Sequence, residues 1–234
     1  MTPPKVVKAK LIKKIPLNDE SLHFIFEMHE KAEWAPGQFA LIGVNDNQEP
    51  PLKRPFSIAS SPLDSPQISF MIKHHHGRAT NWLFDKIKEG EETELMIPMG
   101  HMTLQENEDE QLIIGTGIGI APMFSLIDYL AAKNFPQKTR LVYGARHVKE
   151  IFYLEKLEKL SKEHENFELY TTVSRPEVEW NGNTGRADSV LENLDIDFSK
   201  QNSYICGSPP VASSLKELIV KLGVVEEKIK MEAF

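Results

Sequence analysis

Four short segments of this sequence combine side chains that can bind phosphate, hold a flat ring, and supply a thiol or a carboxylate. In Arg54-Pro55-Phe56-Ser57 the Arg complements a phosphate charge, the Phe offers its face to a ring system, and the Ser donates a hydrogen bond. A plain barrel strand with an outward Arg and an inward Phe is an equally good interpretation of this segment alone.

The second segment is a glycine-rich turn, Gly115-Thr116-Gly117-Ile118-Gly119-Ile120-Ala121-Pro122, between an expected strand and an expected helix. Its glycines let the backbone approach a pyrophosphate, free amides and the helix dipole face that anion, and Pro122 suits a first helical turn. The third glycine of the usual dinucleotide fingerprint is absent, and no acidic residue follows about twenty positions later to hold a ribose. A dinucleotide loop and a plain tight turn both remain open.

The third segment, Cys206-Gly207-Ser208-Pro209-Pro210, follows an expected strand and opens a helix, so Cys206 should emerge beside the glycine turn at the carboxyl edge of one sheet. A buried structural cysteine is the plainer interpretation of a lone thiol, and no neighbouring base indicates a thiolate nucleophile. The fourth segment is Glu232-Ala233-Phe234. Together, and in this order, the four segments suggest a flavin and a nicotinamide held face to face.

Composition argues against several classes of protein. The 234 residues include 27 Lys and Arg against 34 Asp and Glu, and the net charge of −7 disfavours non-specific nucleic-acid binding. The single cysteine excludes an internal disulfide and the four-ligand set of an iron-sulfur cluster, so any redox cofactor is expected to be organic. No apolar run approaches the roughly 20 residues that span a bilayer. We expect a cytoplasmic protein with no membrane insertion and no nucleic-acid partner.

Two different patterns divide the chain. Short, often alternating apolar segments fill the first half, with one amphipathic helix, and a polar, acidic stretch at 105–110 follows as a linker. Strands then alternate with helices, which is typical of a parallel sheet covered by helices. The predicted fold is therefore two-domain: residues 1–106 form an antiparallel six-stranded β-barrel with one helix, and residues 107–234 form an α/β doubly wound parallel sheet. The strands expected in the barrel are 5–15, 21–28, 38–44, 56–60, 67–73 and 94–97, with the helix at 78–88; the second half has strands at 112–114, 139–143, 167–173, 204–206 and 228–231 and helices at 122–133, 150–164, 188–194 and 209–222.

Some further residues invite a functional interpretation. Gly77-Arg78-Ala79-Thr80 opens the barrel's helix and offers an anion site, although a simple helix start looks identical. Arg146 and Ser174-Arg175 follow strands at the binding edge, where they can hold a ribose phosphate or be ordinary surface arginines.

Two other groups of basic residues have plainer explanations. We expect no metal at His74-His75-His76, because consecutive strand residues alternate faces and no Cys or carboxylate cluster lies nearby in the sequence. The lysines between residues 5 and 14 are interpreted first as solvated residues guarding an edge strand, and second as a basic edge for an acidic partner.

Over essentially its whole length the chain resembles the ferredoxin-NADP reductase superfamily. Arg54-Pro55-Phe56-Ser57 is similar to the R-x-Y-S flavin motif, with Phe for Tyr, and Thr116 to Pro122 is similar to the G-G-T-G-I-A-P loop, with Thr for the first Gly and Ile118 for the Thr. Cys206-Gly207-Ser208-Pro209-Pro210 resembles the C-G-P-P loop, and the last three residues resemble a terminal E-x-aromatic.

The resemblance implies roles for these positions. It implies that Ser57, Cys206 and Glu232 form the hydride-transfer site. The flavin-binding residues implied are Arg54, Pro55, Phe56, Ser57, Met71, Ile72, Lys73, Gly77, Arg78, Ala79, Thr80 and Phe234. Those implied for the nicotinamide dinucleotide are Thr116, Gly117, Ile118, Gly119, Ala121, Pro122, Arg146, Ser174, Arg175, Cys206, Gly207, Ser208 and Pro209.

The expected activity is transfer of hydride from NAD(P)H to a bound FAD, and then of electrons to a one-electron carrier protein such as ferredoxin or flavodoxin, or to an oxygenase component. FMN is less expected than FAD, and the arginines favour NADPH slightly over NADH. An alternative is an NAD(P)H:flavin oxidoreductase that uses free flavin as substrate, since the R-P-F-S variant occurs in such enzymes. A third, from another class, is a non-catalytic adapter subunit of a redox complex. A monomer is expected.

Overall fold

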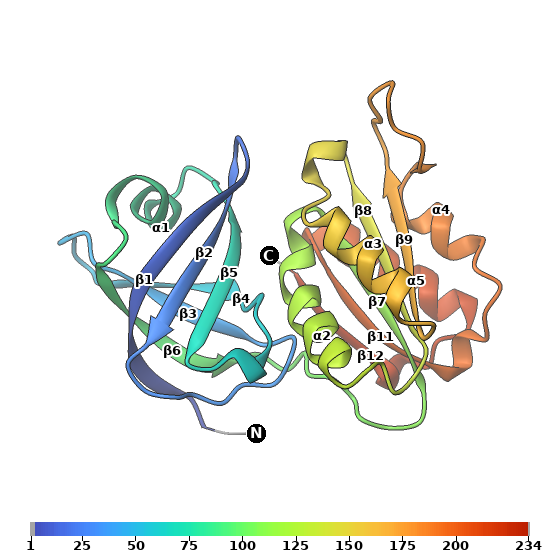
Figure 1. The fold of residues 1–234 in the computed structure, drawn as a ribbon, viewed down its shortest axis with the longest axis horizontal. Coiled ribbons are helices and arrows are strands. Elements are labelled where there is room, and N and C mark those ends of the chain that lie inside the picture. The colour runs from blue at the N-terminus through green and yellow to red at the C-terminus, as the bar shows by residue number, and fades with distance from the viewer. Residues whose placement is uncertain (1–2, 234) are drawn as a thin grey trace. The chain divides into compact units, whose positions relative to one another are not determined.

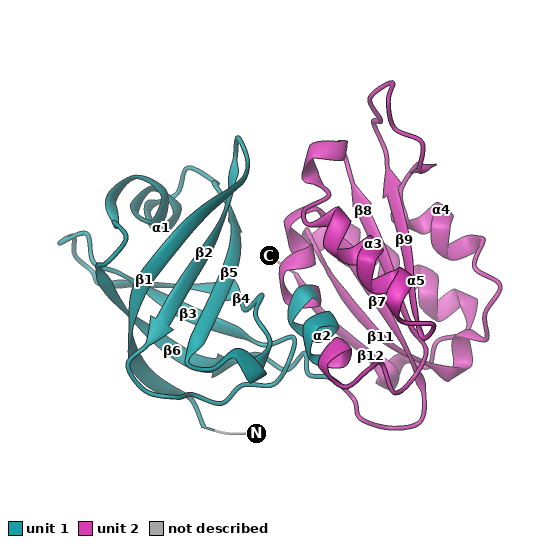
Figure 2. Ribbon diagram, viewed as in Figure 1, with its two compact units in different colours: residues 1–104, 124–129 teal, residues 105–123, 130–234 magenta. Residues whose placement is uncertain are grey.

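The computed structural model describes residues 3–233 (Figure 1). The chain forms two compact units, coloured separately in Figure 2. The first extends to Leu104 and includes residues 124–129, and the second comprises residues 105–123 and 130–234. The expected boundary between residues 106 and 107 stays a prediction about domains.

The first unit is an antiparallel six-stranded sheet that curls into a barrel. Its strand order is β4-β3-β6-β1-β2-β5, and every pairing within it is antiparallel. This architecture confirms the predicted barrel. The strands are β1 (Lys5–Asn18), β2 (Ser21–Met28), β3 (Phe39–Val44), β4 (Leu52–Ser57), β5 (Gln67–Lys73) and β6 (Glu92–Met99).

Strand β1 lies inside this sheet, between β6 and β2, so its lysines do not guard an edge. That prediction was wrong, because the alternation of β1 was visible in the sequence whereas its neighbours were not. Register places Lys8 opposite Glu94, and Lys10 opposite both Glu92 and Glu27. Opposite charges therefore face one another across the strands, and this part of the outer surface is of mixed charge.

Within residues 3–233, one isolated bridge closes the barrel. The two end strands of the sheet, β4 and β5, meet through an isolated bridge between Ile58 and Phe70, supported by the hydrogen bond from Ala59 N to Ser69 O at 2.8 Å. Ile58 comes directly after the last residue of β4, Ser57, and Phe70 directly precedes Met71 within β5. Closure is thus confined to the end of the strands that lies beyond the flavin motif.

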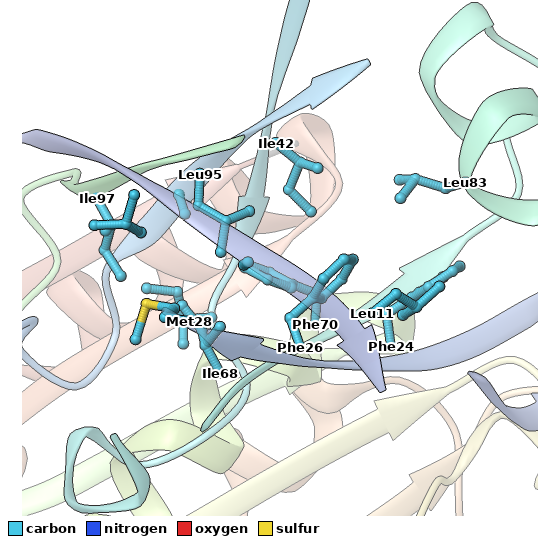
Figure 3. Packing of buried hydrophobic residues seen from close by; sticks show 14 of the residues in the cluster. Leu11, Phe24, Phe26, Met28, Ile42, Ile68, Phe70, Leu83, Leu95 and Ile97 are labelled. Atoms are coloured by element: carbon cyan, nitrogen blue, oxygen red, sulfur yellow. The ribbon is translucent and has the colours of Figure 1, made fainter. Parts of the chain in front are cut away.

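Aromatic and branched aliphatic side chains fill the barrel. Figure 3 shows Phe24, Phe26 and Phe70 gathered in the centre of this cluster, and all three are completely buried. Phe26 and Phe70 meet edge to face with ring centroids 6.0 Å apart. Such pairs add to the stabilisation from buried apolar area, so the core holds the strands in one register.

The expected helix after β5 is present in two parts. Helix α1 (Arg78–Asn81) continues directly into the π-helical turn η2 (Trp82–Lys86). Trp82 and Leu83 are buried against the barrel core, which explains the apolar face read from the sequence.

The second unit is a parallel six-stranded sheet in the order β10-β9-β8-β7-β11-β12. Helices α4 and α5 share one apolar cluster on one face, and Figure 1 shows α3 on the opposite face. The doubly wound sheet is therefore confirmed. Its strands are β7 (Glu110–Thr116), β8 (Thr139–Ala145), β9 (Phe167–Val173), β10 (Asn183–Thr184), β11 (Gln201–Gly207) and β12 (Ile229–Ala233), and its helices are α2 (Ala121–Ala132), α3 (Leu154–Glu163), α4 (Ala187–Glu192) and α5 (Pro209–Leu222).

The strand order reverses direction between β7 and β11. From β7 the chain adds β8, β9 and β10 on one side, and then crosses to add β11 and β12 on the other. In doubly wound sheets such a switch point leaves space at the carboxyl ends of the two central strands, where ligands bind. The glycine turn and Cys206 follow or end these two strands.

Several elements differ from expectation. Strand β4 begins at Leu52 rather than 56, so it contains the whole Arg54 to Ser57 segment. Helix α3 begins at Leu154 rather than 150, because residues 148–150 form a separate 3-10 turn and Tyr153 adopts a left-handed conformation with φ of 55°. The two-residue strand β10 was not expected. No helix among residues 3–233 is long and apolar enough to cross a membrane.

Candidate functional site

Two of the predicted flavin segments lie on the two end strands of the barrel sheet. Strand β4 pairs with β3 only, and β5 pairs with β2 only. Beyond the bridge at Ile58 and Phe70, no ladder hydrogen bond among the described residues joins residues 54–57 to residues 71–73. We call these two stretches the open seam. One row of backbone N–H and C=O groups on each strand is left for other partners, such as a ring with its own donors and acceptors.

Strand register places Arg54 and Phe56 on the same face of β4. Arg54 lies opposite Ile42, Phe56 lies opposite Ala40, and both of these β3 residues are completely buried. The interpretation of an outward Arg beside an inward Phe is therefore wrong, because residues two apart on a strand share a face. Phe56 is half-buried against the barrel core, whereas Arg54 is exposed, and within the described residues its guanidinium hydrogen-bonds only to the carbonyl of Lys53, at 3.2 Å.

The remaining seam residues have mixed surroundings. Met71 and Ile72 are buried, so their backbone is what a ligand would meet. Lys73 pairs with Glu20 at 2.9 Å, and Ser57 is half-buried. The seam thus offers one hydroxyl, one exposed guanidinium and unpaired backbone groups.

The turn into α1 has room for a ligand at Gly77. A Cβ atom on Gly77 would meet no atom within 4 Å, and its φ of −90° is open to any residue. Neither packing nor conformation within the chain therefore requires glycine here, which fits close approach by a bound group. Thr80 is buried, and its Oγ1 accepts from Gly77 N at 3.2 Å, so its hydroxyl orders this turn.

Arg78 has partners that were not foreseen. Its Nε and Nη2 donate to the two carboxylate oxygens of Asp46, both at 2.7 Å. Nothing in the sequence marked Asp46, because it lies in a polar loop some thirty residues earlier. The Arg78 guanidinium is accordingly used within the chain, while Ala79 is buried beside it.

The glycine turn is compact. Residues 117–120 form a 3-10 turn that runs straight into α2, and the proline falls in the first helical turn as expected. Gly117 has φ of 54° and no atom within 4 Å of its Cβ position, so both its conformation and its open surroundings suit glycine. Ile118 is half-buried, and Ala121 and Pro122 are buried.

Gly119 packs directly against the strand that carries the cysteine. A Cβ on Gly119 would lie 2.5 Å from the carbonyl oxygen of Cys206, and a Cβ on Gly207 would overlap Thr116 Oγ1. Glycine is therefore needed at 119, where the clash is with backbone atoms, whereas at 207 the Thr116 hydroxyl could rotate away. The structure brings together these four residues, which are some ninety positions apart in the sequence.

Cys206 lies between two neighbours in the sheet. Parallel register pairs it with Gly115 of β7 on one side and Glu232 of β12 on the other. Only 1% of Cys206 is exposed. Burial, and to a smaller extent the negative charge of Glu232, raise the pKa of the Cys206 thiol to about 12. The thiol is therefore neutral at physiological pH, and the side chain is not a thiolate nucleophile.

The helix that follows Cys206 begins at the expected prolines. Ser208, Pro209 and Pro210 are exposed, and Pro209 opens the fourteen-residue helix α5. Neither proline has a backbone N–H, and the amide of Ala212 donates to Ser208 O at 2.9 Å, so the start of α5 offers few free amides to a ligand.

The loops after β8 and β9 carry two exposed arginines. Arg175 N donates to Arg146 O at 2.8 Å, so the two loops are in contact. Neither guanidinium has a hydrogen bond or ion pair within the described part of the chain, and Ser174 between the loops is exposed.

Two carboxylates beside these arginines are occupied by the backbone. Glu150 accepts from the amides of Arg146 and His147 at 2.9 and 3.2 Å. Glu177 accepts from Val148 N at 3.1 Å, and this contact is the main cause of its lowered pKa. Sequence reasoning missed both, although Glu150, at the third position of a short turn after a strand, fits a recognisable capping pattern.

The histidine run does not form a metal cluster. The rings of His74 and His76 meet edge to face at 4.4 Å, and His74 also contacts Phe84 at 4.6 Å. Among residues 3–233, no group of three or more metal-binding side chains is present. Phe234 lies outside the described residues.

Comparison with known proteins assigns the two halves separately. Residues 8–104 match the oxidoreductase FAD-binding domain, and residues 113–217 match the oxidoreductase NAD-binding domain. Together the two matches cover most of the chain, and each covers one of the candidate half-sites.

Several characterised proteins are similar over most of this chain. The reductase component of the naphthalene 1,2-dioxygenase system of Pseudomonas putida is 24% identical over 99% of this chain and 70% of its own length. The glycine betaine monooxygenase reductase subunit of Pseudomonas aeruginosa is 31% identical over 85% of this chain, which spans about half (56%) of that protein. The crystal structure of a cytochrome P450 reductase from Amycolatopsis has a TM-score of 0.91 at 18% identity, covering 100% of this chain and 71% of that one.

Proposed function

Because the chain belongs to the ferredoxin-NADP reductase superfamily, we propose that it passes hydride from NAD(P)H to a bound FAD and then passes electrons to a one-electron carrier protein or an oxygenase component. Members of this class are NAD(P)H-dependent flavoprotein reductases, and this chain is an enzyme of that kind, with FAD and a nicotinamide dinucleotide as its cofactors.

The observation that carries the proposal is the arrangement around Cys206. Gly115, Cys206 and Glu232 stand side by side on three parallel strands, at the point where the strand order reverses. Gly119 packs against the carbonyl of Cys206. A dinucleotide whose pyrophosphate meets the glycine turn before α2 would therefore extend its nicotinamide over the end of β11.

The open seam fits a flavin. Phe56 would pack against the ring system, Ser57 would donate a hydrogen bond to it, and Arg54, which has no acidic partner in the described structure, would pair with a flavin phosphate. Gly77 leaves room for the backbone to approach that phosphate. When bound, FAD supplies a centre that accepts two electrons together and releases them singly.

The chain's own residues orient the donor and protect the step. The neutral thiol of Cys206 can lie against a nicotinamide ring without the desolvation cost that a thiolate would carry. Burial is the main cause of the raised pKa of that thiol, and Glu232 adds to it while supplying a carboxylate at the same sheet edge. Orientation of this kind contributes to rate by holding the reacting groups together, which is the main role we assign to these residues.

A protein acceptor is supported by the relatives. The matched proteins from the two Pseudomonas species are named as a ferredoxin reductase component and a monooxygenase reductase subunit. Both are longer than this chain, so the chain's own acceptor is a proposal. Ferredoxin, flavodoxin or an oxygenase component would meet the same chemical requirement, which is to accept one electron at a time.

Use of free flavin is the second candidate. It is favoured by the R-P-F-S segment, in which Phe replaces the Tyr of the R-x-Y-S motif. Gel filtration of the purified protein distinguishes the two candidates. FAD that co-elutes with the protein in about equimolar amount supports a resident cofactor. A colourless protein that turns over added riboflavin supports the use of free flavin as a substrate.

Anaerobic mixing with NADPH or NADH tests the enzyme itself. We expect rapid bleaching of the flavin absorbance near 450 nm, slowed at least about tenfold in Cys206→Ala. If the wild-type protein binds flavin but neither nucleotide bleaches it, the chain is a non-catalytic adapter. A monomeric state and a cytoplasmic location remain predictions, which light scattering and cell fractionation would test.

A further inference from the structure

Arg78 is surrounded by acceptors from the loop between β3 and β4. Besides the two contacts with Asp46, its Nη1 donates to Pro50 O at 2.9 Å and its Nη2 donates to Gln48 O at 2.7 Å. Four of its five N–H donors are thus used. The Asp46 side chain is only 11% exposed and that of Arg78 26%. We call this set of contacts the Arg78–Asp46 bridge.

The bridge is the main described attachment of an otherwise exposed loop. Residues 45 and 47–51 are exposed, and apart from the bridge their described contact with the barrel is the hydrogen bond from Asn45 Nδ2 to Glu92 O at 3.2 Å. This loop leads directly into β4, where Arg54 follows two residues after the strand begins. The position of the strand's first half therefore depends on where the loop is held.

The other end of the bridge lies at the Gly77 turn. Arg78 is the first residue of α1, so its backbone is fixed beside the open space at Gly77 while its side chain holds the loop before β4. Because β4 is an end strand of the sheet, the ladder fixes it on the β3 side only. One guanidinium thus fixes the spacing between the ring-binding strand and the phosphate-binding turn.

We propose that Arg78 is a positioning residue of the flavin site, acting through Asp46, and that it does not bind the flavin phosphate itself. The inference rests on the proposed flavin site in the open seam. It replaces the expectation that Arg78 contacts the cofactor, since a guanidinium with one remaining donor cannot make the bidentate contact that phosphate recognition favours.

Two single variants and their combination distinguish positioning from direct binding. In Asp46→Asn and in Arg78→Met, apoprotein should bind FMN and FAD about tenfold more weakly, while riboflavin, which has no phosphate to reach Gly77, should change by less than about twofold. The double variant should be no weaker than either single variant, because each change breaks the same bridge. Quenching of flavin fluorescence on titration measures all of these affinities.

The controls separate this effect from general destabilisation. Lys5→Met removes the exposed ion pair that Lys5, on β1, forms with Glu30, and it should leave every flavin affinity unchanged. Thermal unfolding of each apoprotein reports stability independently of binding. Arg78→Lys keeps the charge but not the planar fork, and should fall between the wild type and Arg78→Met.

The outcomes are distinct. If Arg78→Met loses affinity for FMN while Asp46→Asn keeps or gains it, Arg78 binds the phosphate directly and the proposal is wrong. If the variants lose affinity for riboflavin and FMN equally, the proposal is also wrong. Should Arg78→Met fail to fold, the near-isosteric Asp46→Asn decides alone. Wild-type protein that binds no flavin would instead remove the flavin site, and with it the proposed function.

Discussion

Cys206 and Glu232 are register partners on the neighbouring parallel strands β11 and β12, and the charge of the carboxylate adds to burial in keeping the thiol protonated. The pair lies at the carboxyl edge of the sheet, one strand away from the glycine turn. This arrangement uses a thiol for its size and neutrality, where many enzymes use a cysteine as an anion.

The fall in the free energy of unfolding at alkaline pH should depend on Cys206. The thiol's pKa is about 12 in the folded protein against an ordinary 9.0, so the unfolded chain loses this proton first. The stabilisation that comes from keeping this thiol neutral is therefore complete below pH 9 and is lost as the pH rises toward 12. Over that range the free energy of unfolding falls by at most about 1.4 kcal/mol per pH unit. Urea unfolding at about pH 8 and about pH 10 should show a smaller loss of stability in Cys206→Ala than in the wild type. Identical losses would show that the thiol is not shielded.

Glu232→Gln should affect both the thiol and the reaction. Removing the negative charge lowers the pKa of Cys206, so the pH profile of its alkylation by iodoacetamide shifts toward lower pH. Flavin bleaching by NAD(P)H should slow by about tenfold or more while the melting temperature stays close to that of the wild type. Glu226→Gln is a matched control, because this exposed carboxylate pairs with half-buried Lys216. If both variants reduce flavin at the wild-type rate, Glu232 has no part in the site.

Gly119→Ala should damage the nucleotide half selectively. Its Cβ would lie within 2.7 Å of three backbone atoms of Cys206 and Gly207, none of which can move without shifting β11. We expect a loss of about 1–3 kcal/mol in the free energy of unfolding and a raised KM for NAD(P)H. Gly77→Ala is the contrasting change, since its Cβ would meet nothing within 4 Å. It should leave stability unchanged but weaken FAD binding. Wild-type stability in Gly119→Ala would contradict the close contact.

Arg175→Ala should distinguish the two nicotinamide dinucleotides. The Arg146 and Arg175 guanidinium groups have no acidic partner among the described residues, because Glu150 and Glu177 accept from backbone amides. They are therefore available to a 2′-phosphate. The KM for NADPH should rise about tenfold while that for NADH changes by less than about twofold. An equal effect on both would place the arginine elsewhere than at the ribose phosphate.

The sequence predicted the elements of this molecule better than their surroundings. Alternating apolar residues and the strand-helix pattern located both sheets, since periodicity is a local property. The interior position of β1 was missed, because which strands become neighbours depends on contacts distant in the chain. The same limit explains why Lys8 and Lys10 were interpreted without their facing acids.

The candidate site shows the same division. Glycine turns, prolines at helix starts and a lone thiol after a strand are local signals, and they marked the residues that the structure brings together around Cys206. Asp46 and Glu177 carry no such signal, because an acidic residue in a polar loop is ordinary until its partner is known. Arg78 was assigned to a ligand for this reason, although its acceptors lie within the chain. Whether Ser57 joins Cys206 and Glu232 in one site stays a prediction.

The central pair of strands has a consequence for biosynthesis. Strands β7 and β11 are direct neighbours, although Glu110 and Gln201, which meet at their start, are 91 positions apart. While residues 201–233 are still inside the ribosome, β7 lacks a partner on one side and Gly119 lacks the backbone on which it packs. The nucleotide half must therefore mature late, and ribosome-bound chains that end before residue 201 should expose an apolar strand edge to chaperones.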